Sequence, residues 1–152
     1  MVAYGGIYNA STQLVFFTQV DQLVQVRFNS TLPSQNVSYP GSNSLTVDVA
    51  GDYEINYNLL LNANELVNVS FAVRNNGTII PQTRGAQSIA FDVELSLSAD
   101  GRLSGSTIAS LAAGDTLDMV LSVINSLPAN LDTALNGNIN TCLTVKKLDA
   151  LS

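Results

Sequence analysis

The stretch from Leu45 to Leu61, LTVDVAGDYEINYNLLL, decides the fold class. A short alternating run enters a turn at Ala50-Gly51-Asp52, and a longer alternating run leaves it. Side chains of a β-strand point alternately to its two faces. The longer run therefore predicts a central strand with one buried and one polar face, namely Tyr53, Ile55, Tyr57, Leu59 and Leu61 against Glu54, Asn56 and Asn58.

Similar alternating runs recur along the chain, separated by turn residues. Asn75-Asn76-Gly77 stands between Val67–Arg74 and Thr78–Gln82, and Asn-Gly between two apolar runs indicates a β-hairpin. Further strands are predicted at Ala3–Asn9, Leu14–Phe17, Val20–Phe28, Ser88–Leu97, Leu103–Leu111, Thr116–Ile124 and Ile139–Leu148. Residues 125–137 are predicted to form a loop. The pattern predicts one all-β domain over residues 1–152, a sandwich or barrel of about ten strands.

The composition excludes several classes of function. Only 12% of the residues are charged, against 46% hydrophobic, which is typical of rigid extracellular or capsid-like β domains. The net charge of −6 disfavours nucleic acid and anionic membranes as partners. No apolar run approaches the roughly 18 residues needed to cross a bilayer. The chain has no histidine and one cysteine, Cys142, so it lacks the commonest general base and cannot form an internal disulfide.

Pairs of carboxylates are the one catalytic arrangement that this composition allows, as in glycoside hydrolysis. The candidate pairs are Asp48 with Asp52, Asp92 with Glu94, and Asp115 with Asp118. Each pair lies at a turn or on an alternating strand, where solvated acids are expected, so we predict no catalytic residues and no cofactor. A structural calcium ion near Asp100-Gly101 or Asp115 stays open, although turn chemistry explains both acids without a metal.

Apolar residues also stand on the nominally polar face of several strands: Leu23, Leu60, Val120 and Ile124. Single exposed apolar side chains are normal in soluble proteins. A group of them on adjacent strands would form a patch, and such patches usually mark an interface. The pattern is therefore compatible with an oligomer.

Three stretches together resemble the C1q/tumour-necrosis-factor-like jelly-roll superfamily. GDYEINYNLLL (Gly51 to Leu61) is similar to its central strand, and VSFAVRNNGTII (Val69 to Ile80) to its Asn-Gly hairpin. SGSTIASLAAGDTLDMVLSV (Ser104 to Val123) looks like its paired strands around Gly-Asp. Within the superfamily, the STIASLAAGDTL wording and the low charge are most similar to the C-terminal domains of BclA-type collagen-like exosporium glycoproteins of spore-forming bacteria.

The resemblance implies a two-sheet antiparallel jelly-roll sandwich that assembles into a homotrimer. It also implies an extracellular position on the spore surface, a role in nucleating a collagen-like stalk, and contact with a host protein, a glycan or another surface. No Gly-X-Y repeat is present, so the chain is expected to be a fragment of a longer protein. The expected sandwich core is Tyr53, Ile55, Tyr57, Leu59, Leu117, Met119 and Leu121. The expected trimer interface is Tyr4, Ile7, Asn56, Asn58, Leu60, Ile139, Thr141 and Leu143. On the last strand, Ile139, Thr141 and Leu143 face one side and Cys142 the other, and the pattern leaves open which of the two sides forms the interface.

Two other classes remain open at this stage. A carbohydrate- or receptor-binding knob of a phage or bacterial fibre would also be trimeric, and a Gly-X-Y segment upstream would rule against it. A glycosidase would need a pocket that holds two carboxylates.

Overall fold

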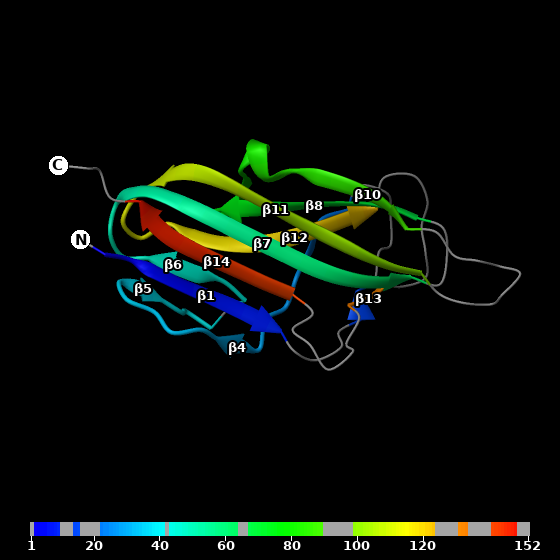
Figure 1. Ribbon diagram of the computed structural model, residues 1–152, viewed down its shortest axis with the longest axis horizontal. Coiled ribbons are helices and arrows are strands. Elements are labelled where there is room, and N and C mark those ends of the chain that lie inside the picture. The colour runs from blue at the N-terminus through cyan, green and yellow to red at the C-terminus, as the bar shows by residue number, and fades with distance from the viewer. Residues whose placement is uncertain are drawn as a thin grey trace, which may run out of the picture.

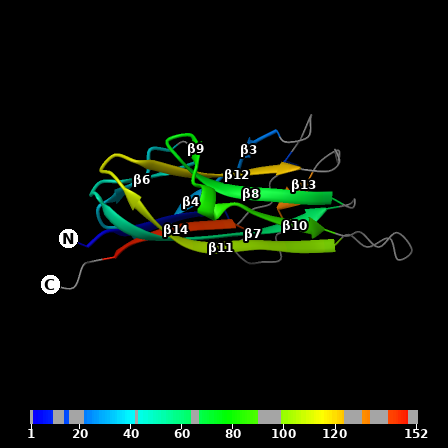
Figure 2. The same ribbon diagram turned by 90° about the horizontal axis from the view of Figure 1, so that it is seen from above.

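Two antiparallel sheets face each other in the computed structural model, which describes residues 2–9, 14–15, 22–41, 43–63, 67–89, 99–123, 131–133 and 141–148. Figure 2 shows them as two layers. Strands β1, β2, β4, β7, β11, β13 and β14 make the first sheet: Tyr4–Asn9, Leu14–Val15, Ser30–Thr31, Gly51–Ala63, Ala99–Leu111, Leu131–Thr133 and Thr141–Leu148. Strands β3, β5, β6, β8, β9, β10 and β12 make the second: Val24–Gln25, Val37–Ser38, Leu45–Val47, Val67–Asn75, Thr78–Ile79, Gly85–Ile89 and Thr116–Val123.

Strand β7 lies at the centre of the first sheet, as its alternation predicts. It pairs along its whole length with β11 on one edge. Its other edge pairs with β14 and, further along, with the short β13. Strand β1 adds to β14, so β11, β7, β14 and β1 lie side by side (Figure 1). Strand β1 begins and β14 ends at the same end of the long axis, because Tyr4 pairs with Lys146.

The core fills the space between the sheets with the inward residues of both. All seven residues predicted for the core are buried, and none is more than 5% exposed. Tyr57 packs against Phe71 across the sandwich, with 5.6 Å between the ring centroids. Gly105 lies opposite Tyr57 in the β7–β11 register and leaves room for its ring. The all-β, two-sheet fold class is therefore confirmed.

Two tight turns lie at one end of β12 and are tied together by a single carboxylate. Asn76 and Gly77 both have positive φ, as a two-residue hairpin turn requires. Asp115 accepts hydrogen bonds from the side-chain amides of Asn75 and Asn76 and from the backbone N–H of Ala112. These bonds lower the pKa of Asp115, the bond from Ala112 contributing most. Asp115 therefore joins the β8–β9 turn to the β11–β12 turn.

Several predicted boundaries differ from the structure. Strand β7 begins at Gly51, so the preceding turn lies slightly earlier than Ala50-Gly51-Asp52. The predicted strand Thr78–Gln82 ends at Ile79, because Pro81 opens a 3₁₀ turn, η1 (Pro81–Thr83). Within Val20–Phe28, only Val24–Gln25 pairs as a strand among the described residues. The predicted loop 125–137 contains β13, and most of Ser88–Leu97 lies outside the described residues.

The 3₁₀ turn η1 is fixed to β8 by one buried threonine. Thr83 is fully buried, and its hydroxyl accepts a hydrogen bond from the backbone N–H of Val73 at 2.9 Å. The same hydroxyl donates to the carbonyl of Ile80 at 2.7 Å. The carbonyl of Thr83 accepts from the hydroxyl of Tyr57 at 2.9 Å. The hydroxyl and the carbonyl of Thr83 therefore fix η1 to β8 of the second sheet and to Tyr57 of the first.

Candidate interaction surface

The side of the first sheet that faces away from the core is largely uncharged across its first rows. The strand registers arrange its side chains in rows that cross β1, β14, β7 and β11. We call this surface the outer face; its first two rows are Tyr8, Cys142, Asn58, Ser104 and Gly6, Thr144, Asn56, Ser106. Neither row carries a charge. Depletion of charge in the centre of a surface is the compositional signature of protein–protein interfaces.

The third row borders this uncharged area and contains Tyr4, Lys146, Glu54 and Ile108. Its two ends are the exposed apolar ones, since Tyr4 is 40% and Ile108 60% exposed. Between them, the amide of Asn56 donates a hydrogen bond to Glu54 at 3.0 Å. Charged groups thus begin where the uncharged area ends, as at the polar rim of an interface.

The residues predicted for a trimer interface fall into three groups. Tyr4, Asn56 and Asn58 do lie on the outer face. The backbone of Leu60 belongs to β7, but its side chain and the whole of Ile139 lie outside the described residues. Ile7, Thr141 and Leu143 are at most 3% exposed, and Ile7 and Leu143 belong to the core.

These three positions correct the prediction. On β14 the odd-numbered side chains point inward, and Cys142 and Thr144 point outward. Thr141 is held inside by a hydrogen bond from its hydroxyl to the carbonyl of Asn58. Because Ile7 pairs with Leu143, it points inward as well. Buried side chains of this kind stabilise the subunit itself rather than a contact between subunits.

The apolar residues predicted on the polar faces of strands differ in their exposure. Leu23 is 47% exposed, whereas Val120 is only 1% exposed, although it does not belong to the core between the two sheets. Ile124 lies outside the described residues, as does the side chain of Leu60. The two described residues of this set, Leu23 and Val120, line the same small pocket, together with Ala72 and Ile79.

Cys142 lies on the outer face and is partly buried. Burial raises the pKa of its thiol. A raised pKa keeps the thiol protonated at neutral pH, and the thiol is a much weaker nucleophile than the thiolate. Cys142 thus acts as a small apolar side chain of the outer face.

The predicted carboxylate pairs serve strands and turns. Asp118 forms an ion pair with Arg74 at 2.6 Å, while Asp115 joins two turns as described above. Asp48 accepts from the hydroxyl of Ser38, and Asp52 from that of Ser110. Asp92 and Glu94 lie outside the described residues. Among the residues that the structure does describe, no three histidine, cysteine or acidic side chains group into a metal site.

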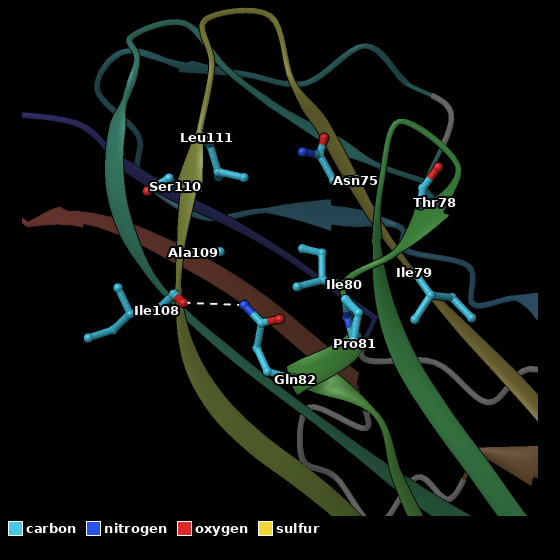
Figure 3. A pocket seen from close by; sticks show the side chains of 10 residues that line it. All are labelled: Asn75, Thr78, Ile79, Ile80, Pro81, Gln82, Ile108, Ala109, Ser110 and Leu111. Carbon is cyan, nitrogen blue, oxygen red and sulfur yellow. Dashed lines mark hydrogen bonds between the residues drawn. The ribbon is translucent and has the colours of Figure 1, made fainter.

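A groove of about 400 Å³ runs beside the outer face, between the edge of β11 and the segment β9–η1 (Figure 3). Ile80, Pro81 and Leu111 line it, together with the polar Asn75 and Gln82. The Gln82 amide lies 3.4 Å from the carbonyl oxygen of Ile108 and donates a hydrogen bond to it. The Ile108 side chain stands on the other side of β11 from Leu111 (Figure 3), so Ile108 is shared between the groove and the outer face.

The sequence did not reveal this groove, since it forms where η1 crosses β11, far apart in the chain. The only local signal was Pro81, which ends a strand and turns the chain toward β11. The part of the chain that the structure describes has no helix long and apolar enough to span a membrane.

Of the comparisons with known proteins, the one with solved structures agrees with this architecture. No protein-family model matches the sequence, and no curated protein matches it significantly. Among solved structures, 243 chains match. One is the crystal structure of murine APRIL at pH 5.0, with a TM-score of 0.62 and 12% identity over 97% of this chain and 100% of that one. The chain thus has the jelly-roll fold of proteins similar to tumour necrosis factor.

Proposed function

We propose that this chain is a non-enzymatic homotrimeric head domain that uses its outer face to join three copies. The observation that supports this best is the uncharged two-row surface across four adjacent strands of a TNF-like jelly roll. Small side chains such as Ser106 and Thr144 let another subunit approach closely, and no buried charge has to be compensated. Joining copies, rather than turning over a substrate, is the role that such a surface suits.

The finer part of the proposal concerns the protein that carries this head. The likeness of STIASLAAGDTL to collagen-like exosporium glycoproteins supports a position outside the cell, on the surface of a bacterial spore. There the trimer would end a collagen-like stalk, hold its three chains in register and contact a host or another surface. Collagen chains need three strands in register, and a trimeric head raises their local concentration. The proposal includes no cofactor.

The mass in solution tests the trimer. Light scattering coupled to size exclusion should give three times 16.1 kDa at micromolar concentration. Replacing the exposed Ser106 on the outer face by arginine should shift this mass to 16.1 kDa, because three guanidinium groups would be buried without partners.

Ser34→Arg is the matched control, since Ser34 is an equally exposed serine in the loop between β4 and β5. This variant should keep the mass of the parent. A monomeric parent protein would refute the proposed function. A Ser106→Arg variant that stays trimeric would mean that the outer face is not the contact.

A further inference from the structure

A pocket of about 190 Å³ lies at the edge of the sandwich that is remote from β11. Strand β4 is the last strand of the first sheet on this side, and β11 is the last on the other (Figure 1). Residues from β1 and from 28–31 form one wall of the pocket, and residues of the segment between β5 and β6 form the other. All of these residues belong to one chain, so the pocket is complete within a single subunit.

Hydrogen bonds from side chains hold the two walls in place. The hydroxyl of Tyr39 accepts from the backbone N–H of Gly6 at 3.0 Å and donates to the carbonyl of Leu32 at 2.8 Å. The side-chain oxygen of Asn43 accepts from the backbone N–H of Phe28 at 3.0 Å. The segment between β5 and β6 is thus fixed to β1 and to the residues around β4. A pocket that is fixed in this way is preformed, and a ligand binds it without the free-energy cost of ordering a loop.

The backbone of Asn43 is held in the left-handed region. Its φ is 62°, and Gly41, two residues before it, has a φ of 86°. Positive φ is unfavourable for a residue with a Cβ, although asparagine tolerates it better than most, and such residues gather at functional sites. The Asn43 oxygen is used by Phe28, while its nitrogen has no hydrogen-bond partner among the residues that the structure describes. Since Asn43 is only half-buried and lines the pocket, its two N–H donors are available to a ligand.

The pocket offers apolar and polar contacts, but no charge. Phe28 and Tyr39 line it with their rings and pack against the core. Because the face of an aromatic ring is partly negative, it attracts the weakly positive C–H groups of a ligand. The hydroxyls of Ser30 and Thr31 and the amide of Asn43 supply hydrogen-bonding groups. None of the lining residues is charged, so the pocket favours a neutral ligand.

The volume limits the size of such a ligand. Pockets for drug-sized molecules measure about 300–1,000 Å³, so a volume of about 190 Å³ suits a single ring. A neutral pyranose sugar is one such ring, with an apolar C–H face and hydroxyl groups around its edge. We propose that the pocket binds one neutral pyranose ring, with Phe28 and Tyr39 against its C–H face and the Asn43 amide donating to one of its hydroxyl groups.

This inference deepens the contact role in the proposed function and rests on it for the source of the sugar, which is a glycan of the contacted surface. A trimer carries three such pockets, one on each subunit. Three pockets on one particle raise the avidity for a surface that presents many glycans, because each further contact forms at a high effective concentration.

An NMR titration of the isotope-labelled protein tests the pocket. The probes are the methyl glycosides of glucose, galactose, mannose and N-acetylglucosamine, added to millimolar concentrations, together with the corresponding free sugars. We expect saturable shifts of the Asn43 side-chain amide and of the Phe28 backbone N–H with at least one glycoside. Glycerol, which has hydroxyl groups but no ring, should give no saturable shift. N-acetylneuraminic acid should give none either, because its carboxylate finds no positive partner among the lining residues.

Two glycine variants separate the amide of Asn43 from its backbone conformation. Asn43→Gly keeps a residue that readily adopts positive φ and removes the amide. It should weaken binding of the glycoside about two- to tenfold, the loss expected for one hydrogen bond. Asn36→Gly is the matched control and should bind like the parent, because Asn36 is also half-buried, has a φ of 55° and donates its amide to Val2, outside the pocket. Phe28→Leu, which keeps an apolar wall without a ring, should weaken binding as well and replaces Asn43→Gly if that variant does not fold.

The outcomes distinguish the sugar pocket from the proposed trimer. No saturable shift with any glycoside, or saturable shifts confined to other parts of the chain, would overturn the pocket. Equal binding by the parent, Asn43→Gly and Phe28→Leu would overturn it too. Binding of the free sugars alone would rule out a glycan as the source. A monomeric parent that binds would refute the trimer and keep the pocket, whereas a trimer that does not bind would refute the pocket and keep the trimer.

Discussion

Replacing Thr83 by valine tests the idea that one hydroxyl fixes η1 to β8. Valine keeps the shape of threonine but removes the oxygen that accepts from Val73 and donates to Ile80. Thr83 is fully buried, so water cannot replace the lost partner. A buried backbone N–H left without an acceptor costs about 1–3 kcal/mol. Together with the lost bond to Ile80, we expect Thr83→Val to lower the free energy of unfolding by about 2–3 kcal/mol.

The assay is urea denaturation at a fixed protein concentration, because the stability of an oligomer depends on concentration. With a slope of about 1–3 kcal/mol per molar urea, the midpoint should fall by about 1 M or more while the slope stays constant. Thr83→Ser is the control. It keeps the hydroxyl and loses one methyl group, so it should cost about 1 kcal/mol. The reasoning is refuted if serine destabilises more than valine, because packing rather than hydrogen bonding would then hold η1.

Two further predictions concern Asp115 and Gly105. The pKa of Asp115 is lower in the folded chain than in the unfolded one, so its contribution to stability is present above the unfolded value of about 3.9 and is lost as the pH falls through the folded value. The urea midpoint should therefore fall less between neutral and acidic pH in Asp115→Asn than in the parent protein. An equal fall in both proteins would contradict this prediction. A Cβ at Gly105 would lie 2.6 Å from Cζ of Tyr57, whose ring cannot move without losing its bond to Thr83. Gly105→Ala should thus lower the free energy of unfolding by about 1–3 kcal/mol in the same denaturation assay. Ser104→Ala, at the exposed neighbouring position, is the control and should change it by no more than about 0.5 kcal/mol. Equal losses in the two variants would show that the Tyr57 ring can move aside.

The sequence predicts well what depends on alternation within one strand. In β7, large apolar residues alternate with Glu54 and Asn56, so the two faces are distinguishable and the core assignment of Tyr53 and Ile55 follows. In β14, by contrast, Thr141 and Cys142 are both small and uncharged, and the contrast between the two faces rests on Leu143 and Val145 against Thr144 and Lys146. This alternation separates the faces, but in an oligomer either face of a sheet can be covered by protein. The interface prediction therefore included Thr141 and Leu143, which lie inside the subunit.

Features that depend on two distant segments could not be predicted in this way. The groove exists because η1 lies over β11, and the hydroxyl of Thr83 reaches back to Val73 across the preceding turn. Nothing in the local pattern around Thr83 distinguishes it from the many other threonines of the chain. Turn positions were easier, since the positive φ that Asn76-Gly77 needs is a property of those two residues themselves.

The neighbouring ends of β1 and β14 determine how the subunit carries a mechanical load. The two strands are antiparallel, and the start of β1 and the end of β14 lie at the same end of the long axis, next to the pair Tyr4–Lys146. Hydrogen bonds between antiparallel strands run perpendicular to them. A force that pulls the two ends apart therefore meets these bonds one after another, as in opening a zip, and not all together as in shear. A force applied along β1 at its Tyr4 end instead loads the whole β1–β14 ladder in shear, so this direction of pull is the mechanically resistant one.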